Sequence, residues 1–189
     1  MGQQQNPEEA ALKAKDGDTD AFGIIFDAYI ERIYRFVYYK THHKETAEDV
    51  TSEVFKKALS SIGSFDPVKG SLCGWMYRVA RNTVIDHYRT KRPTDAIDDM
   101  WELMSDSDTE RDTEARMAAE QLQKHLVVLT SEQRDIVLLR VWEEMDYKEI
   151  AEAVGDTETA CKTDFLRSVS KLRDGMGFAT LLFVLTEWL

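Results

Sequence analysis

Apolar residues recur at intervals of three and four along most of this chain, and this period restricts the fold more than any other feature. Such spacing places side chains on one face of an amphipathic α-helix. The first such face comprises Phe22, Ile25, Phe26, Tyr29, Ile33, Phe36 and Val37. No segment alternates polar and apolar residues as a half-buried strand does, and no Asn-Gly or Asp-Gly turn joins β-rich segments. The sequence therefore predicts an all-α fold.

Two further helices are expected in the first half of the chain. One carries Val50, Val54, Leu59 and Ile62 on its apolar side. Residues 63–70 (GSFDPVKG) contain two glycines and a proline, which predicts a loop. The next helix extends from about Leu72 to Arg89, ahead of Pro93. Its apolar side holds Met76, Val79, Ala80 and Val84, and its other side holds Trp75, Arg78, Arg81, Asn82, Ile85 and Arg89.

The second half of the chain has the pattern of a helix-turn-helix. Thr130 with Gln133 and Asp146 with Glu149 have the spacing of capping boxes, which start helices. Gly155 is expected to end the second of these helices in a left-handed conformation, and Thr157 to start the last one. The last helix turns Cys161, Phe165, Val169 and Leu172 inward. In a helix-turn-helix, the second helix can lie in the major groove of DNA.

The charge of the chain is unevenly distributed. The net charge is −11, yet the segment from Lys69 to Arg92 holds six basic residues and one acidic residue. Residues 94–115 hold nine acidic residues and one basic residue, which indicates a linker between two small helical domains. The expected organisation is an N-terminal extension (1–14), a first domain (15–93), the acidic linker (94–115), a second domain (116–175) and an apolar tail (176–189). An acidic chain with one basic patch is suited to a targeted nucleic-acid contact.

Several classes of protein are disfavoured by what the chain lacks. Its two cysteines, Cys73 and Cys161, are far apart and form no CxxC motif, so neither a disulfide scaffold nor a cysteine zinc site is expected. His42, His43 and His87 lack metal-ligand spacing, and no phosphate-binding or nucleophile motif occurs. We expect no catalytic activity, metal or cofactor. With no secretory signal pattern and no apolar run long enough to span a bilayer, we also expect no membrane insertion and a cytoplasmic location.

Three segments resemble parts of bacterial sigma factors. ETAEDVTSEVFKKAL and FDPVKGSLCGWMYRVARNTVIDHYRTKRP resemble region 2, and LTSEQRDIVLLRVWEEMDYKEIAEAVGDTETACKTDFLRSVSKLR resembles region 4. With only a short linker between them, the chain looks like the extracytoplasmic-function class of the sigma-70 family. The resemblance implies a sigma factor that binds core RNA polymerase, directs it to promoter DNA, and is held in check by an anti-sigma factor. The alternative is a sigma-like decoy that sequesters an anti-sigma factor without binding promoters.

The resemblance also implies roles for particular residues. Residues expected to bind core polymerase are Asp49, Val50, Glu53, Val54 and Phe55. Residues expected to bind the minus-10 element, including an unpaired base, are Phe65, Lys69, Ser71, Trp75, Arg78, Arg81, Asn82 and Arg89. Residues expected to bind the minus-35 element are Thr157, Thr159, Lys162, Thr163, Arg167 and Lys171. Single strands are bound by cationic grooves and stacking surfaces, which is the role expected of the arginines and of Trp75.

The sequence departs from the resemblance at two places. Relatives usually carry a basic residue at the position of Asp164 and a polar one at that of Leu166, so the last helix is nearly neutral and should bind duplex DNA weakly by itself. The tail (176–189) is rich in large apolar residues, whose exposure to water is unfavourable. It is either a final helix packed on its own domain or an autoinhibitory or partner-binding segment.

Overall fold

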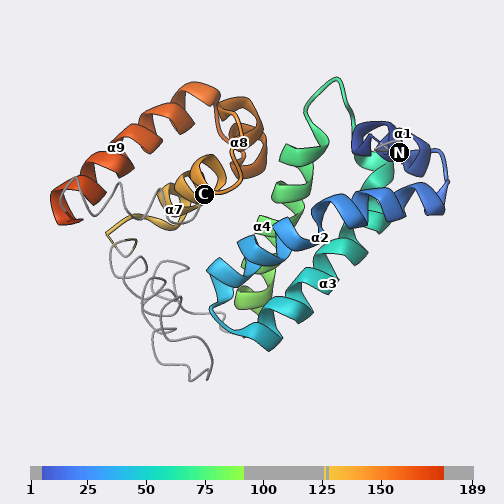
Figure 1. Cartoon of the computed structure of the whole chain (residues 1–189), viewed down its shortest axis with the longest axis horizontal. Helices are drawn as coiled ribbons and strands as arrows, with labels where there is room; N and C mark the ends of the chain where they lie inside the picture. Colours follow the sequence, from blue (N-terminus) through green and yellow to red (C-terminus); the bar gives the residue numbers. More distant parts are fainter. Residues whose placement is uncertain (1–5, 92–125, 127, 177–189) are drawn as a thin grey trace, which may run out of the picture. The chain divides into compact units, whose positions relative to one another are not determined.

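The chain folds into two compact helical units, residues 1–93 and residues 94–189 (Figure 1). The computed structural model describes residues 6–91, 126 and 128–176. Within these ranges there are seven α-helices and one 3-10 helix, and no strand. The predicted all-α fold is therefore confirmed. The predicted linker (94–115) and the tail from residue 177 onward lie outside the described residues.

The first unit contains α1 (Pro7–Lys15), α2 (Thr19–Thr41), α3 (Lys44–Ser61), the 3-10 helix η1 (Ile62–Ser64) and α4 (Leu72–Lys91). Helices α2, α3 and α4 pack on one another, and α1 packs on α2 (Figure 1). The two long helices α2 and α3 are separated by only two residues because His42 adopts a left-handed conformation (φ 49°) and His43 starts α3. The ring nitrogen Nδ1 of His43 accepts a hydrogen bond from the backbone N–H of Thr46 (3.2 Å).

Aromatic side chains of α2 and α4 form the centre of this unit. The rings of Phe36 and Tyr77 meet edge to face, with centroids 5.4 Å apart, and both are buried. The guanidinium of Arg32 lies 5.5 Å from the ring centroid of Tyr29 and 5.8 Å from that of Tyr77. This cation is therefore placed over two aromatic faces, which attract it electrostatically. The inward side of α4 is fixed by these contacts, so its opposite side faces solvent.

The apolar stripe of α2 is broader than its buried face. Six of the seven stripe residues named above are buried, but Phe26 is 41% exposed. Leu59, expected on the apolar side of α3, is 45% exposed. A stripe that exceeds what one core can cover leaves apolar surface available for another contact.

The expected N-terminal extension (1–14) does not hold as a separate segment, because α1 belongs to the first unit. Asn6 caps α1 by accepting a hydrogen bond from the backbone N–H of Glu8 (3.0 Å), and Pro7 occupies the first turn. The buried side of α1 consists only of small residues, Ala10, Ala11 and Ala14. Small side chains carry little hydrophobic periodicity, which is why the sequence pattern did not identify this helix.

The second unit contains α7 (Ser131–Val141), α8 (Tyr147–Val154) and α9 (Glu158–Met176), which pack on one another. Both predicted capping boxes are present: Thr130 with Gln133 starts α7, and Asp146 with Glu149 starts α8. Gly155 ends α8 with φ 82°, as predicted, and donates its N–H to the carbonyl of Ala151 (2.9 Å). The unit is thus a helix-turn-helix, with α8 and α9 on either side of a glycine turn.

A small apolar core holds the second unit together. Its buried residues come from α7, α9 and the segment before α7, and partly buried hydrophobic side chains pack against them: Leu126, Leu129, Val137 and Leu172, then Val141, Trp142, Phe165 and Val169. The predicted inward residues Cys161 and Leu172 are buried, and burial raises the pKa of the Cys161 thiol to about 11. This thiol stays protonated near neutral pH, as expected of a packing residue.

None of the helices that the structure describes is long and apolar enough to cross a membrane. This finding concerns residues 6–91, 126 and 128–176 alone.

A pair of glycine substitutions tests the turn between α8 and α9. Gly155→Ala should destabilise the second unit by about 1 kcal/mol or more, because an L side chain is strained at this positive φ. Gly23→Ala in α2 should stabilise the first unit by about 0.5–1 kcal/mol, since its φ is helical and nothing lies within contact distance of the added methyl group. Hydrogen exchange of the full-length variants, read separately for the residues of each unit, measures both changes in stability. A Gly155→Ala protein as stable as wild type would contradict the turn assignment.

Candidate nucleic-acid and partner interfaces

The solvent-facing side of α4 carries the basic residues that the sequence predicts to contact DNA. Arg78, Asn82 and Arg89 are exposed, whereas Arg81 and Ile85 are half-buried. One acidic residue, Asp86, shares this helix, and its carboxylate pairs with Lys57 of α3 at 3.0 Å. The pairing draws the Asp86 charge toward α3, which leaves the neighbouring arginines to set the local potential. This face can contact phosphates, and the Asn82 amide can both donate to and accept from a base edge.

The two aromatic residues expected to contact DNA are buried instead. Trp75 is 4% exposed and Phe65 is 1% exposed, and their ring centroids lie 5.9 Å apart. Both rings are packed inside the unit in this structure, so the stacking role of Trp75 and the base contact of Phe65 stay predictions that require these rings to become exposed. Trp75 lies one turn after the start of α4, and its side chain points inward against the loop that precedes the helix. Helical spacing alone does not show which way the first turn of α4 faces.

The loop between η1 and α4 is organised around Asp66. Its carboxylate accepts the backbone N–H of Val68 (3.1 Å) and pairs with the Lys69 ammonium (3.3 Å). Its backbone carbonyl accepts the N–H groups of Lys69 (3.0 Å) and Gly70 (3.3 Å). The hydrogen bond from Val68, followed by that from Lys69, lowers the pKa of Asp66 below its ordinary value.

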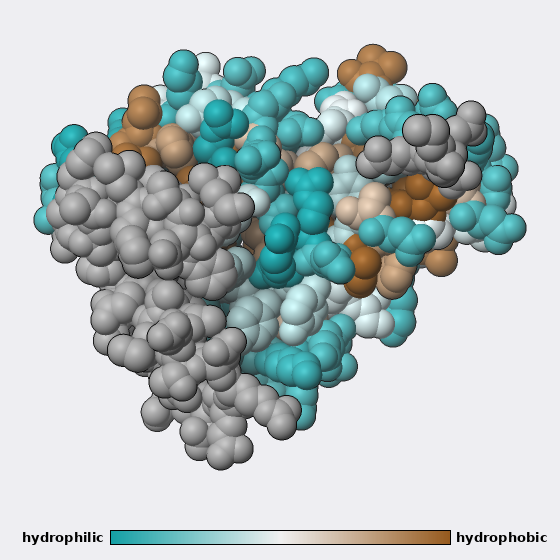
Figure 2. Space-filling model, viewed as in Figure 1, coloured by the Kyte–Doolittle hydropathy of each residue, from teal (hydrophilic) through white to brown (hydrophobic). Residues whose placement is uncertain are grey.

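The tip of this loop projects into solvent. Val68 is 92% exposed, and Figure 2 shows hydrophobic atoms standing at the tip of the loop. The side chain of Lys69 is 83% exposed even though it pairs with Asp66. Ser71, expected to contact DNA, is half-buried and its hydroxyl accepts the N–H of Gly74 (3.0 Å). The serine therefore caps α4, and the loop presents Val68 and Lys69 outward.

An apolar groove of about 530 Å³ lies between α2 and α3. Its apolar lining comes from Phe26, Ile30 and Phe55, and the rings of Phe26 and Phe55 meet at 4.8 Å. Three charged side chains and three further polar ones complete the lining: Glu31, Arg35, Glu48, Tyr34, Thr51 and Ser52. Burial, followed by the nearby charge of Glu48, raises the pKa of Tyr34 above its ordinary value. An apolar floor with a charged rim is the usual composition of a protein-binding patch.

The groove changes the interpretation of the residues expected to bind a polymerase. Asp49 and Glu53 are exposed on α3, as expected. Val50, Val54 and Phe55 are 2%, 0% and 6% exposed, so their expected direct contacts are not available except at the Phe55 edge that lines the groove. The sequence pattern did not identify Phe26, Ile30 and Tyr34 as surface residues. The excess width of the α2 stripe was the signal that could have identified them.

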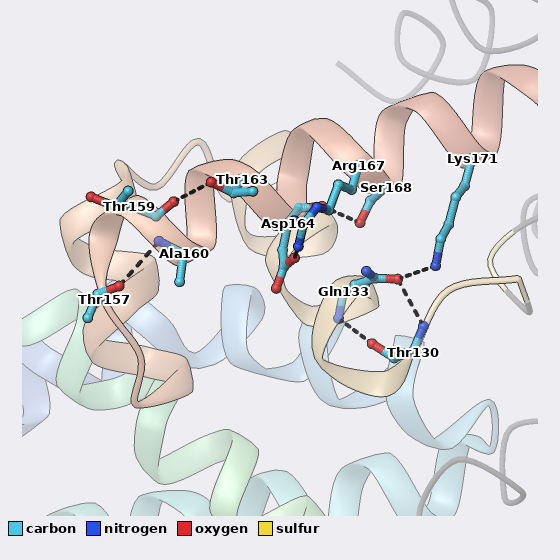
Figure 3. Close-up of polar contacts among 10 residues, drawn as sticks. All are labelled: Thr130, Gln133, Thr157, Thr159, Ala160, Thr163, Asp164, Arg167, Ser168 and Lys171. Carbon is cyan, nitrogen blue, oxygen red and sulfur yellow. Dashed lines mark hydrogen bonds and ion pairs between the residues drawn. The ribbon is translucent and has the colours of Figure 1, made fainter.

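Hydroxyl groups at the start of α9 are engaged in the helix itself (Figure 3). Thr157 caps α9, as predicted, by accepting the N–H of Ala160 (3.2 Å). Thr163 donates its hydroxyl to the carbonyl of Thr159 (2.8 Å). Three threonines are expected to contact DNA: Thr157, Thr159 and Thr163. The hydroxyl groups of Thr157 and Thr163 are thus already engaged in hydrogen bonds within α9, although all three side chains are exposed.

Two of the expected DNA-binding cations on α9 have partners within the same unit. The Arg167 guanidinium pairs with the Asp164 carboxylate at 3.3 Å. The Lys171 ammonium donates to Oε1 of Gln133 in α7 at 3.0 Å (Figure 3). Lys162 is exposed, and Leu166, which lies between Lys162 and Arg167 in the sequence, is 59% exposed. The internal contacts and the Asp164 charge lower the attraction of α9 for a polyanion.

Metal chemistry finds no support in the part of the chain that the structure describes. No group of three His, Cys, Asp or Glu side chains lies close enough there to hold an ion.

Two family models match the chain, one in each unit. Residues 25–94 match the model described as Sigma-70 region 2, and residues 119–172 match the model described as Sigma-70, region 4. The first match includes α3, the Asp66 loop and the basic face of α4. The second includes the whole helix-turn-helix up to Leu172.

Two curated sigma factors are similar to most of this chain. The chain is 33% identical over 169 residues to the ECF RNA polymerase sigma factor BldN of Streptomyces coelicolor, covering 87% of this chain and 63% of that protein. It is 28% identical over 172 residues to the ECF RNA polymerase sigma factor SigW of Bacillus subtilis, covering 85% and 91%. The chain thus spans less than two thirds of BldN and nearly all of SigW.

A solved structure shows the same fold. It is the sigma factor RpoE in complex with the anti-sigma factor NepR from Bartonella quintana, with a TM-score of 0.63 and 16% identity. The match covers 81% of this chain and 94% of that chain.

One substitution tests whether the α9 ion pair limits DNA binding. Asp164→Asn should raise affinity for duplex DNA and steepen the slope of log K against log salt by about one unit, because Arg167 becomes available to a phosphate. Titration of the full chain with a duplex promoter fragment at several salt concentrations measures the slope. Glu158→Gln, which changes the net charge equally on the same helix, is the control. An equal slope change in both variants would show that total charge, and not release of Arg167, is responsible.

Proposed function

Because this chain belongs to the extracytoplasmic-function class of the sigma-70 family, with region 2 followed by region 4, we propose that it binds core RNA polymerase and directs initiation at a subset of promoters. The observation that carries the proposal is the exposed basic face of α4 beside a structured loop, in a protein whose net charge is −11. A cationic surface confined to one helix favours a single defined nucleic-acid contact over general attraction to DNA.

The groove between α2 and α3 is the proposed polymerase-binding surface. Its apolar floor supplies the desolvated centre that protein interfaces require, while Glu31, Arg35 and Glu48 form a charged rim. Asp49 and Glu53 occupy the adjacent stripe of α3, since neighbouring residues on a helix differ by about 100° in direction. They extend the rim with negative charge and favour a basic partner surface.

The proposed minus-10 contact combines α4 with the Asp66 loop. Arg78 and Arg89 are placed to bind phosphates, and the Asn82 amide is placed to read a base edge. The exposed tip at Val68 and Lys69 lies on the segment that the family resemblance assigns to an unpaired base. With Trp75 buried, strand separation in this protein depends on cationic contacts and on the loop more than on an aromatic wedge.

The proposed minus-35 contact, made by α9, is weak by itself. Arg167 is paired with the Asp164 carboxylate and Lys171 is hydrogen-bonded to Gln133, and a duplex is bound mainly through phosphate contacts. Attachment to polymerase raises the local concentration of α9 near the promoter and compensates for low intrinsic affinity. The two units therefore act as a tandem binder.

The proposed regulation and cellular location rest on the same family membership. An anti-sigma factor is the proposed inhibitor, since the structural neighbour from Bartonella quintana is bound to one. We propose a cytoplasmic regulatory DNA-binding protein without enzymatic activity of its own. The decoy alternative requires a protein that does not support promoter-dependent transcription, so reconstitution with core polymerase separates the two.

The polymerase-binding groove is tested by Phe26→Asp. A charge on the groove floor should weaken binding to core polymerase by about tenfold or more, because a central apolar contact is lost and a charge is desolvated. Fluorescence anisotropy of the labelled full chain with core polymerase gives the affinity. Leu12→Asp is the matched control, since Leu12 is 44% exposed on α1 and Phe26 is 41% exposed. Similar losses in both variants would place the polymerase contact elsewhere.

The minus-10 reading is tested by Asn82→Ala. Promoter preference should relax at one minus-10 position by about 1–3 kcal/mol, the usual worth of a bidentate base contact. Run-off transcription from a genomic promoter library with core polymerase measures this, with Lys56→Ala, an exposed change on α3, as the control. An unaltered promoter profile would remove Asn82 from the base contacts. A wild-type protein that binds core polymerase but never initiates would contradict the proposed function as a whole.

A further inference from the structure

Two side chains of α1 contact the two ends of the loop between η1 and α4. The Lys15 ammonium donates to the backbone carbonyl of Phe65 at 2.7 Å. Oε1 of Glu8 accepts the backbone N–H of Leu72 at 2.8 Å. The partners are 50 and 64 residues apart in the sequence, and both hydrogen bonds are partly buried.

The spacing of Glu8 and Lys15 matches this arrangement. Seven residues make about two helical turns, so the two side chains leave the same side of α1 about 10 Å apart along its axis. Asn6 caps the first turn of α1 by accepting the N–H of Glu8, and three buried alanines pack α1 against the rest of the unit. The two charged groups are therefore fixed on the body of the domain.

Both contacts are of the stronger kind. Each joins a charged side chain to a backbone group, and charge-assisted hydrogen bonds are about twice as strong as neutral ones. The Leu72 N–H belongs to the first turn of α4, where amide groups lack helical partners and a negative charge is favoured. Lys15 contributes a positive charge near the loop, and this charge is one of the causes that lower the pKa of Asp66.

The loop between these two anchors carries the surface proposed to contact the unpaired strand. Its two ends are also held by burial of Phe65 and by the Ser71 cap, while Asp66 orders the turn within. Val68 and Lys69 remain exposed at the tip. The exposed tip is thus mounted on a loop whose ends are tied to a different helix.

We propose that α1 is a brace for this loop, with Glu8 and Lys15 as positioning residues that set how sharply the protein discriminates bases at the minus-10 element. The inference rests on the proposed minus-10 contact and extends it to a segment far away in the sequence. A loop that is already ordered loses less conformational freedom when the strand binds. A fixed tip also admits fewer base shapes than a mobile one.

The test compares Glu8→Ala and Lys15→Ala with conservative and neighbouring variants. Glu8→Gln and Lys15→Arg keep an acceptor and a donor, whereas Glu9→Ala and Lys13→Ala remove the same chemistry from exposed neighbours on α1. Full-length variants are assembled with core polymerase and presented with a promoter library in which the minus-10 region is randomised. Sequencing of the transcripts gives the preference for each base, and hydrogen exchange gives the protection of the Leu72 amide.

In both Glu8→Ala and Lys15→Ala, base preference at the most selective minus-10 position should fall about fivefold, within the range that one base contact provides. The Leu72 amide should exchange faster in Glu8→Ala, while affinity for core polymerase should remain that of wild type. Lys15→Arg and the neighbouring variants should behave as wild type in every measurement, and Glu8→Gln, which keeps the acceptor without its charge, should lie between wild type and Glu8→Ala. Because the single variants remove one hydrogen bond each, they test the proposal even where the double variant fails to fold.

The failures of the two proposals are distinguishable. Wild-type preference in Glu8→Ala and Lys15→Ala, with faster exchange at Leu72, would overturn the brace and leave the minus-10 contact standing. An equal loss in Glu9→Ala and Lys13→Ala would also overturn it, since any change on α1 would then have the same effect. A wild-type protein without preference at minus 10 would overturn the proposed function.

Discussion

Most of what this molecule presents to its partners depends on how one side of α4 is buried. The contact of Tyr77 with Phe36, and the cation of Arg32 placed over Tyr77, hold the inner side of α4 against α2. With that side fixed, Arg78 and Asn82 lie on the exposed side of α4. The basic surface is therefore a consequence of core packing. A polar or charged helix face needs an apolar one behind it to stay in register.

Local signals in the sequence were sufficient for much of the fold. The capping boxes at Thr130 and Asp146, and the glycine at position 155, depend on atoms within four residues of one another. Such contacts involve only residues that are close in the sequence, so the helix-turn-helix and its boundaries could be predicted directly. The outward residues of α9 followed from the same helical period.

Features that depend on distant parts of the chain could not be read in this way. The period placed Trp75 on the arginine side of α4, yet the ring is covered by Phe65 from a preceding loop. Helix α1 was not predicted because its buried side is made of alanines, which give almost no amphipathic signal. The groove between α2 and α3 needed both helices in place before Phe26 could be recognised as surface. In each instance, the residues that decide whether a side chain is buried belong to another element, and the few residues on either side of the position do not reveal them.

The contacts of Gln133 have a consequence for how α9 engages DNA. Its side-chain oxygen accepts the N–H of Thr130 at the start of α7 as well as the Lys171 ammonium from α9 (Figure 3). Transfer of Lys171 to another acceptor leaves the first of these bonds in place, so α7 keeps its helix start. The Lys171 ammonium is hydrogen-bonded to a neutral amide, which binds a cation less tightly than a carboxylate does. The helix can thus exchange one partner for another while the scaffold beneath it stays rigid.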